Sequence, residues 1–400
     1  MDSWLIWNLT GGSNGGSHVT DVTNASRTLL MGLNTQQWDT RLCELFGVPQ
    51  HLLPAICSSS QIYGYIVTGS LTGTPISGCL GDQQAALLGQ NCLEFGQVEC
   101  TFGAGTFLLY NTGTSVIRSK NGLLTTVAYK LGPNAPTIYA LEGSVANAGA
   151  ALEWLHSGLG LGDGGTEQEE HHSHTLGGEV EGPRRVLARL GSQAPPDPTS
   201  QVYFVPAFSG LYAPYWRRDA GSILCGLSST TGASEVLNGA LRSCGLQTRA
   251  LLRALQADLG LPMPPCLLGG GALGARALLQ AQADCTGIPI VRPHQVECWA
   301  LGAAMAAASA PGIDVWPQHA LPSPSDTFYP NTTEDEREMM YAKWQMAIDR
   351  SFGWSSNAQP LYEAKDNCDI RERRIYASIP AGIFFVSSCL FLLLASKLKN

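Results

Sequence analysis

Helical periodicity of apolar residues is clearest in the second half of the chain. Over 234–259 apolar positions recur every three to four residues, which predicts a long amphipathic helix. Its inward positions are expected to be Leu237, Leu241, Cys244, Leu251 and Leu255. A Thr333-x-x-Glu336 capping box predicts the start of another helix, with Met340, Trp344, Ala347 and Ile348 on its buried face. Small residues over 299–308 predict a helix that packs closely against a neighbour.

The first half of the chain combines shorter helices with strands. Apolar spacing predicts helices over 34–47 and 144–155. Their expected apolar faces are Trp38, Leu42, Leu45 and Phe46 in the first, and Val145, Ala148, Leu152 and Leu155 in the second. We expect an apolar strand at the N-terminus and two strands, at 63–67 and 75–79, joined through Gly73. The aromatic, proline-rich run 203–216 predicts a packed loop between sheet and helix.

The stretch 78–113 is the best candidate for chemistry. A short strand runs into an Ala/Leu helix that begins with Asp82 and Gln83, and free backbone N–H groups at a helix start favour a carboxylate there. The strand–turn–strand that follows carries Gly103 and Gly105, which let backbone amides approach an anion. These features suit phosphoryl transfer from ATP with Mg²⁺ to an alcohol, in which an aspartate accepts the hydroxyl proton. An N-capping aspartate and an ordinary hairpin fit the same spacing, so both interpretations stay open.

Two further glycine positions point to a ligand. Gly149, in the middle of the helix predicted over 144–155, costs about 1 kcal/mol relative to alanine, so either a ligand or a neighbouring helix approaches it closely. From residue 267 a short strand breaks into a glycine-rich turn that opens a helix and presents amides to a ligand. The turn matches the dinucleotide fingerprint over 269–274, but no acidic residue ends a strand about 20 positions later, so that signal is weak.

Composition narrows the class of protein. The 400 residues allow two domains, and 44% hydrophobic residues suffice for sizeable cores. A net charge of −8 with 14% charged residues leaves no basic footprint for nucleic acid. The twelve cysteines contain no Cys-x-x-Cys pair, which favours reduced thiols in the cytosol. The histidine-rich segment 169–174 is interpreted as a solvated loop, with metal binding the alternative. The sequence is compatible with assembly of the chain into a homo-oligomer.

Four segments carry a resemblance to a known family. They are Gly-Asp-Gln-Gln-Ala-Ala-Leu (81–87), Phe-Gly-Ala-Gly-Thr-Phe (102–107), Asn-Gly-Leu-Leu-Thr-Thr-Val-Ala (121–128) and Ala-Leu-Glu-Gly-Ser-Val-Ala-Asn-Ala-Gly-Ala (140–150). In this order they resemble the glycerol kinases of the FGGY carbohydrate kinases, over about residues 2–310. The resemblance implies an α/β, two-domain actin-like ATPase (ribonuclease H-like) fold and phosphorylation of glycerol by ATP with Mg²⁺.

The resemblance also implies roles for particular residues. Asp82 would be the general base and a glycerol ligand, Gln83 a glycerol contact, and Phe107 an apolar wall. The residues implied to bind nucleotide are Gly103, Ala104, Gly105, Gly149, Glu153, Gly270, Gly271 and Ala275.

The sequence departs from the family at several of these positions. The family's usual residues are replaced by Ala104, Glu153, Gly269 and Ala275, and a glutamate beside ATP phosphates is electrostatically unfavourable. The family's earlier segment, with its first phosphate hairpin, is expected to be missing before Met1, leaving the first domain incomplete. A non-catalytic membrane-anchored paralogue or a partial gene product is therefore the alternative, and another polyol or sugar kinase is a further one.

The sequence of the C-terminal part predicts a membrane anchor. Residues 375–396 carry no charge and are flanked by arginines upstream and lysines downstream, and about 20 apolar residues span a bilayer. A buried core helix is the alternative. The expected division is 1–90 for the first domain, 91–315 for the nucleotide-binding domain, 316–370 for a helical extension and linker, and 375–396 for the anchor. We expect the chain to be located on the cytoplasmic face of a membrane, with the mitochondrial outer membrane as the first candidate. A location in the cytoplasm is the alternative.

Overall fold

A mixed seven-stranded sheet forms the centre of the computed structural model, which describes residues 1–103, 105–145, 147–161, 201–270, 275–294, 297–313, 315 and 324–354. The strand order is β15-β14-β13-β7-β8-β10-β9. The strands are β7 (Val98–Phe102), β8 (Thr106–Gly113), β9 (Leu124–Tyr129), β10 (Ile138–Val145), β13 (Leu267–Gly270), β14 (Ile290–Pro293) and β15 (Ser325–Phe328). Strands β7, β13 and β14 are parallel and the remaining pairs are antiparallel.

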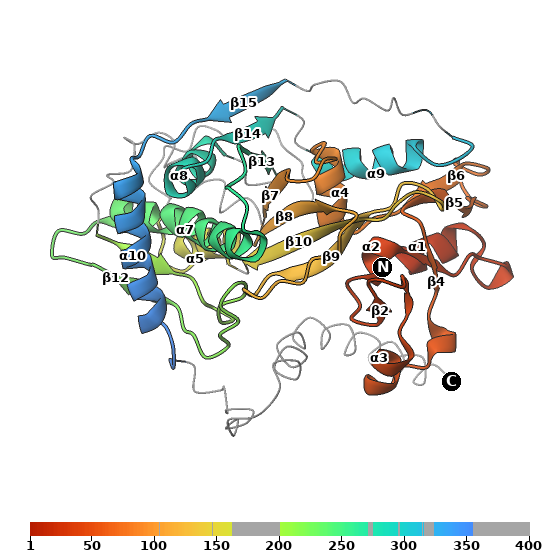
Figure 1. Cartoon of the computed structure of the whole chain (residues 1–400), viewed down its shortest axis with the longest axis horizontal. Coiled ribbons are helices and arrows are strands. Elements are labelled where there is room, and N and C mark those ends of the chain that lie inside the picture. The colour runs from red at the N-terminus through yellow and green to blue at the C-terminus, as the bar shows by residue number, and fades with distance from the viewer. Residues whose placement is uncertain are drawn as a thin grey trace.

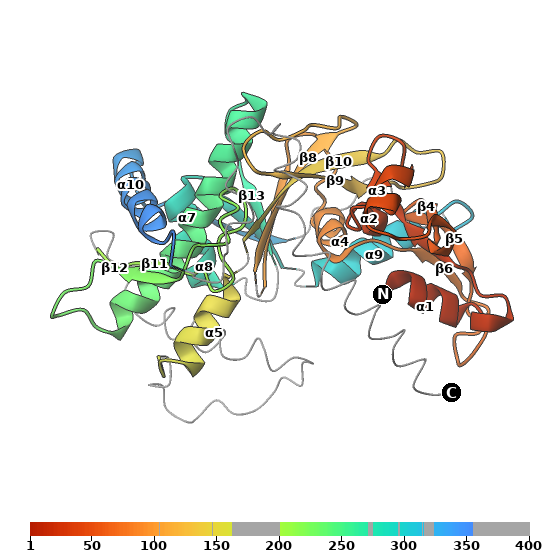
Figure 2. The same ribbon diagram turned by 90° about the horizontal axis from the view of Figure 1, so that it is seen from below.

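Helices cover both faces of this sheet (Figures 1 and 2). One face packs against α4 (Asp82–Gly89) and α9 (Cys298–Ala308), and the other against α5 (Gly149–Ser157), α7 (Ala233–Leu259) and α8 (Arg276–Thr286). Successive side chains of β8 point to opposite faces of the sheet: Leu108 packs on the α7 side and Leu109 on the α4 side. The α/β fold class expected from the sequence is confirmed.

The close packing expected of the small-residue helix is confirmed at the crossing of α9 and α4. A Cβ atom at Gly302 would overlap the backbone carbonyl of Ala85, and one at Gly89 would overlap the carbonyl of Cys298. Only glycine allows the two backbones to approach this closely. The crossing fixes α4, the helix that begins at Asp82, against α9.

The two long helices follow the sequence pattern. All five inward positions expected in α7 are buried. Helix α10 (Glu334–Arg350) begins with the predicted capping box and buries its four expected residues, including Trp344 with no exposed surface. Between the two helices the buried Arg249 side chain reaches Glu334 at 2.9 Å and Glu338 at 2.6 Å.

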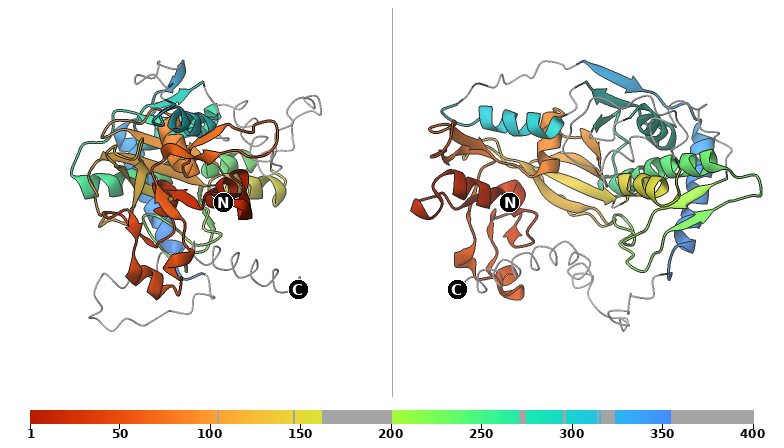
Figure 3. Two further views of the ribbon diagram at one scale, coloured as in Figure 1. Left: turned by 90° about the vertical axis from the view of Figure 1, so that its right-hand side faces the viewer. Right: turned by 180° about the vertical axis from the view of Figure 1, so that it is seen from behind.

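Residues 1–78 form a group of small elements beyond α4 and α9, on the side of the molecule away from α10 (Figures 1 and 3). The elements are α1 (Asp2–Leu9), η1 (Gly12–Asn14), β1 (Val19–Asp21), α2 (Val22–Ala25), β2 (Met31–Gly32), β3 (Gln37–Trp38), α3 (Thr40–Leu45), η2 (Gln50–Leu52), β4 (Ala55–Cys57), β5 (Ser60–Tyr65) and β6 (Pro75–Gly78). Strands β5 and β6 confirm the predicted pair around Gly73, which has φ of +86°.

Three sequence expectations in the first half are wrong. The N-terminal apolar run forms helix α1 instead of a strand, because so short a run carries no periodicity that separates the two. The helix predicted over 34–47 is only α3, since Asp39 caps its N-terminus and the preceding residues form β3; Leu45, expected to be buried, is 60% exposed. The helix predicted over 144–155 begins at Gly149, because β10 extends to Val145.

The expected loop at 203–216 is partly wrong, because its first residues form β11 (Tyr203–Val205), which pairs with β12 (Ile223–Cys225). Several predictions fall outside the described residues: the histidine-rich segment 169–174, the linker within 355–370 and the anchor at 375–396. Within the described part of the chain, no helix is both long and apolar enough to cross a bilayer. The cysteines in that part carry no disulfide.

Candidate active site

Asp82 lies at the first position of α4, and its side chain is exposed. Gly81 is the N-cap of the helix and has extended backbone angles. The Oδ1 atom of Asp82 accepts a hydrogen bond from the backbone N–H of Gln83 at 2.8 Å. The Gln83 side chain is partly buried, and its Oε1 has no hydrogen-bond partner among the described residues. The carboxylate is therefore held loosely by its neighbour and is available to a ligand.

Three strands end at one edge of the sheet. Val145 at the end of β10 pairs with Thr106, and Phe102 at the end of β7 pairs with the same residue. Gly270 at the end of β13 pairs in parallel with Thr101 on β7. The turns that follow all three strands therefore leave the same edge, as the carboxyl ends of strands in ligand-binding α/β sheets do.

The turn after β7 contacts the start of α5. The Gly103 N–H donates to the Gly105 carbonyl at 2.9 Å, and the Gly149 N–H donates to the Gly103 carbonyl at 3.1 Å. Gly149 is thus the first residue of α5 and not the mid-helix residue that the sequence predicted. The hydroxyls of Thr101 and Thr106 beside the turn are buried and have no partner in the described part of the chain. Ala104 lies outside that part.

Three further predicted nucleotide residues lie in the described part of the chain. Gly270 ends β13, and a Cβ atom there would lie 2.8 Å from Nε2 of Gln90. Ala275 is the N-cap of α8, and its side chain has no hydrogen-bonding group. The first backbone N–H groups of α8 are therefore not capped by it. Glu153 is one turn into α5, and its buried Oε2 has no partner among the described residues. Gly271 lies outside those residues.

Phe107 shares the α4 side of the sheet with Asp82. It lies on β8, opposite Thr101 and Ser144, and is half-buried. Its ring packs against the apolar cluster of α4 and α9, together with Leu80, which precedes Asp82 in the chain. The structure thus brings the three proposed substrate residues, Asp82, Gln83 and Phe107, to one side of the sheet and the glycine turns to its edge.

Two buried glutamates near Asp82 were missed by the sequence analysis. Glu142 on β10 is 2% exposed and accepts two hydrogen bonds from Arg27, at 2.6 and 2.9 Å. Burial raises the pKa of Glu142, Arg27 lowers it, and Asp82 raises it further. The sequence did carry a signal for these two glutamates, because each is a charged residue inside an otherwise apolar strand of a chain with few charges.

Glu99 on β7 has no cationic partner among the residues that the structure describes. It is fully buried, its Oε1 accepts a hydrogen bond from Gln90 at 3.3 Å, and its Oε2 has no partner among the described residues. Burial raises the pKa of Glu99 well above its usual range, and the carboxylates of Glu142 and Asp82 raise it further. Burial therefore favours the neutral form of the Glu99 carboxyl beneath the glycine turns.

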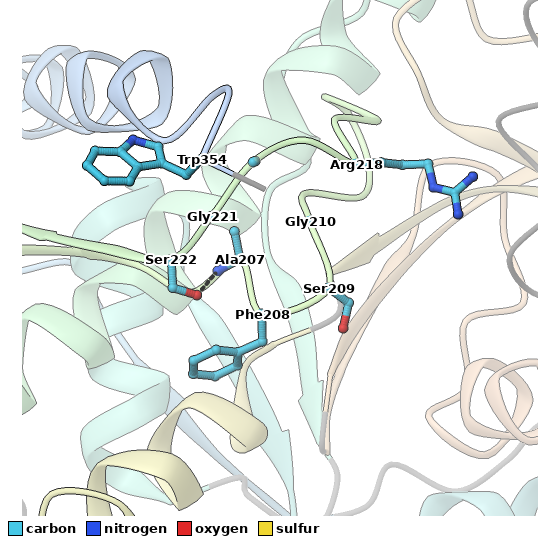
Figure 4. A pocket seen from close by; sticks show the side chains of 9 residues that line it. Ala207, Phe208, Ser209, Gly210, Arg218, Gly221, Ser222 and Trp354 are labelled. Atoms are coloured by element: carbon cyan, nitrogen blue, oxygen red, sulfur yellow. Dashed lines mark hydrogen bonds between the residues drawn. The ribbon is translucent and has the colours of Figure 1, made fainter. Parts of the chain in front are cut away.

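A pocket of about 400 Å³ lies apart from these residues, between the 207–222 segment and Trp354, which follows α10 in the chain (Figure 4). It is lined by Ala207, Phe208, Ser209, Gly210, Arg218, Ala220, Gly221, Ser222 and Trp354, and none of the predicted site residues is among them. The Ala207 N–H donates to the Ser222 hydroxyl at 2.8 Å on its wall. In the described part of the chain, no group of three His, Cys, Asp or Glu side chains could hold a metal ion.

Comparison with known proteins identifies the class to which this fold and site belong. The model of the FGGY family of carbohydrate kinases matches residues 1–89 with its N-terminal domain and residues 98–310 with its C-terminal domain. The chain belongs to the FGGY family of carbohydrate kinases.

Individual relatives agree with this assignment. The chain is 44% identical over 360 residues to a glycerol kinase of Saccharopolyspora erythraea, covering 88% of this chain and 67% of the relative. It is 43% identical to a probable glycerol kinase of Dictyostelium discoideum, covering 88% of this chain and 62% of the relative. The chain thus spans about two thirds of the length of these relatives or slightly less.

Solved structures show the same fold. The crystal structure of Plasmodium falciparum glycerol kinase with ADP superposes with a TM-score of 0.72 at 33% identity, covering 87% of this chain and 65% of that chain. A ligand-bound xylulose kinase from Lactobacillus acidophilus superposes with a TM-score of 0.66 at 19% identity, covering 88% and 68%, which shows likeness of fold alone. The two-domain actin-like ATPase fold expected from the sequence is confirmed.

Proposed function

We propose that this chain phosphorylates glycerol with ATP. The observation that carries the proposal is the arrangement around one sheet edge: β7, β10 and β13 end there in turns, and Asp82 stands exposed on α4 beside the sheet. Glycine turns and helix starts at such an edge suit phosphate groups, and an exposed carboxylate suits proton abstraction from an alcohol. The relatives named glycerol kinase, at 42–44% identity, support glycerol as the acceptor.

Asp82 is the general base in this proposal. It accepts the proton of the attacking glycerol hydroxyl while a bond forms between that oxygen and the γ-phosphorus of ATP. The bond between this phosphorus and the bridging oxygen breaks, and ADP leaves with that oxygen. Gln83, whose side-chain Oε1 has no partner among the described residues, contacts a second hydroxyl, and Phe107 covers the carbon chain.

The nucleotide is held at the sheet edge in this proposal. Backbone amides of the turn at Gly103 and Gly105, the α5 start at Gly149 and the end of β13 at Gly270 face the phosphates, and the buried Thr101 and Thr106 hydroxyls offer unused donors beside them. Mg²⁺ would supply positive charge that offsets the phosphates, and Asp82 is the protein carboxylate that would help to hold it.

Two departures from the family weaken nucleotide binding in this proposal. A Cβ atom at Gly269 would lie 2.6 Å from Ile290 and 3.2 Å from Leu279, so β13 has no room for the side chain that the family carries there. Glu153 places a carboxylate with an unpartnered oxygen one turn beyond Gly149, where it opposes phosphate charge. We therefore expect weaker ATP binding than in a kinase that carries glutamine at this position.

The direct test is product formation by the full chain. With ATP, Mg²⁺ and glycerol we expect glycerol 3-phosphate and ADP to accumulate in equal amounts, and neither to accumulate when glycerol is omitted. Xylulose, ribitol and gluconate in place of glycerol separate this proposal from another sugar or polyol kinase. Folded protein that forms no phosphorylated product from any of these acceptors would contradict the proposal and favour a non-catalytic member of the family.

We further propose that residues 375–396 attach the chain to a membrane, with the catalytic part on the cytoplasmic face of the mitochondrial outer membrane. The support is the uncharged run between basic flanks. The full chain is expected to float with phospholipid vesicles in a density gradient. A variant with Phe385→Lys and Val386→Lys is expected to stay at the bottom, because charges at the centre of a span are costly. Equal flotation of both would refute this proposal.

A further inference from the structure

A buried polar segment lies directly beneath the start of α4. Asp21 ends β1 and caps α2, and no part of its surface is exposed. Its carboxylate accepts hydrogen bonds from the Thr23 N–H at 3.0 Å, the Asn24 N–H at 2.9 Å, the Asn24 side chain at 2.8 Å and the Ser59 hydroxyl at 2.7 Å. Asp21 is therefore a fixed acceptor, and its position is determined from several sides.

The Thr23 hydroxyl connects this acceptor to α4. Its oxygen lies 2.9 and 2.8 Å from the two carboxylate oxygens of Asp21 and 2.8 Å from the backbone nitrogen of Gly81. A hydroxyl has one hydrogen, and a carboxylate only accepts, so Thr23 donates to Asp21 and accepts from Gly81. The direction of both hydrogen bonds is thus determined, and each of the two bonds in this chain strengthens the other.

The position of the Gly81 backbone depends on its hydrogen bond to the Thr23 hydroxyl. It is the N-cap of α4 but has no side chain to cap the helix, and a Cβ atom there would lie 2.5 Å from Oε1 of Gln84. The Asp82 side chain itself contacts only Gln83 among the hydrogen bonds of the described residues. The place of the Asp82 carboxylate is therefore set by the backbone at Gly81, one residue earlier.

The segment is also attached to the central sheet. The Ser26 hydroxyl lies 3.1 Å from the Thr126 hydroxyl on β9, which also accepts from the Gln84 side chain at 3.4 Å. Arg27, next along the chain, pairs with Glu142 on β10. The polar segment beneath α4 is therefore attached to the same sheet whose edge carries the glycine turns.

From these contacts we infer that Thr23 is a positioning residue for the proposed general base: its hydroxyl fixes Gly81 and thereby holds Asp82 at the distance from the sheet edge that phosphoryl transfer requires. The inference rests on the proposed function for its catalytic consequence, but the contact itself is a separate claim about α4. Small displacements of a catalytic group slow a reaction greatly, because they lose the reactive geometry.

The test compares three variants of the full chain. Thr23→Val keeps the shape of the side chain and removes the hydroxyl. Thr23→Ser keeps the hydroxyl. Ser59→Ala removes another hydroxyl donor from the same Asp21 carboxylate without touching Gly81, and so serves as the matched control. Amide hydrogen exchange of the peptide that carries Gly81 reports the contact, and steady-state kinetics report its consequence.

Thr23→Val is expected to accelerate exchange at Gly81 and to lower kcat about tenfold with the KM for ATP unchanged. Thr23→Ser and Ser59→Ala are expected to keep both exchange and kcat near those of the unaltered chain. Unchanged exchange at Gly81 in Thr23→Val, or an equal loss of kcat in Ser59→Ala, overturns the inference. If the unaltered chain forms no glycerol 3-phosphate, the proposed function fails, while the exchange measurement still decides whether Thr23 holds α4.

Discussion

Replacing Asp82 with asparagine is expected to lower the rate of glycerol 3-phosphate formation by about 10²- to 10⁴-fold. Asparagine keeps the shape of the side chain, and its carbonyl oxygen still accepts from the Gln83 N–H, but an amide does not take up the hydroxyl proton. Because Asp82 is exposed, the free energy of unfolding should change little, by no more than about 0.3–1 kcal/mol for the lost charge at the start of α4. The measurement is initial rate at saturating ATP and glycerol, with thermal unfolding of both proteins.

Glu94→Gln is the matched control for this substitution. Glu94 is also an exposed carboxylate, it follows α4 in the chain, and the proposal gives it no role. It should retain the full rate. A rate for Asp82→Asn within a few fold of the unaltered chain would show that another group takes the proton. A loss in both variants would show that overall charge, and not the position of Asp82, determines the rate.

Replacing Glu99 with glutamine is expected to stabilise the folded chain increasingly as pH rises. Burial raises the pKa of Glu99 in the folded state well above its ordinary value of 4.5, near which the carboxyl ionises in the unfolded chain. Above that pH the unfolded state releases a proton that the folded state retains, so stability falls by about 1.4 kcal/mol per pH unit until the folded-state pKa is reached. Glutamine has no proton to lose, and its Oε1 can still accept from Gln90.

The measurement is the free energy of unfolding in urea, at half-unit intervals between pH 5 and 8, for the unaltered chain, Glu99→Gln and Glu94→Gln. The difference between Glu99→Gln and the unaltered chain should grow with pH. Glu94→Gln, the same carboxylate-to-amide change at an exposed side chain, should show no such trend. Parallel curves for Glu99→Gln and the unaltered chain would mean that Glu99 is ionised in the folded state and has a cationic partner.

Local sequence determined the elements whose signals lie within a few neighbouring residues. Helix α7 repeats its apolar spacing over seven turns, and α10 begins with a reciprocal cap between Thr333 and Glu336, so both were predicted with their buried faces. The strand–turn–strand around Gly103 followed from two glycines between apolar runs. Short segments were less certain, because an eight-residue apolar run such as α1 has no period long enough to distinguish helix from strand.

The same division holds for the site. The sequence by itself determined the family, because its motifs stand in the order that the family shares, and it singled out Asp82 and the glycine turns as candidates. Only the tertiary structure decided that three strands end at one edge, that Gly149 meets Gly103, and that Glu99 and Glu142 are buried near Asp82. Those facts depend on contacts between residues far apart in the chain. Burial, the pKa of a carboxyl and the direction in which Thr23 donates its hydrogen are set by such contacts, which no local pattern records.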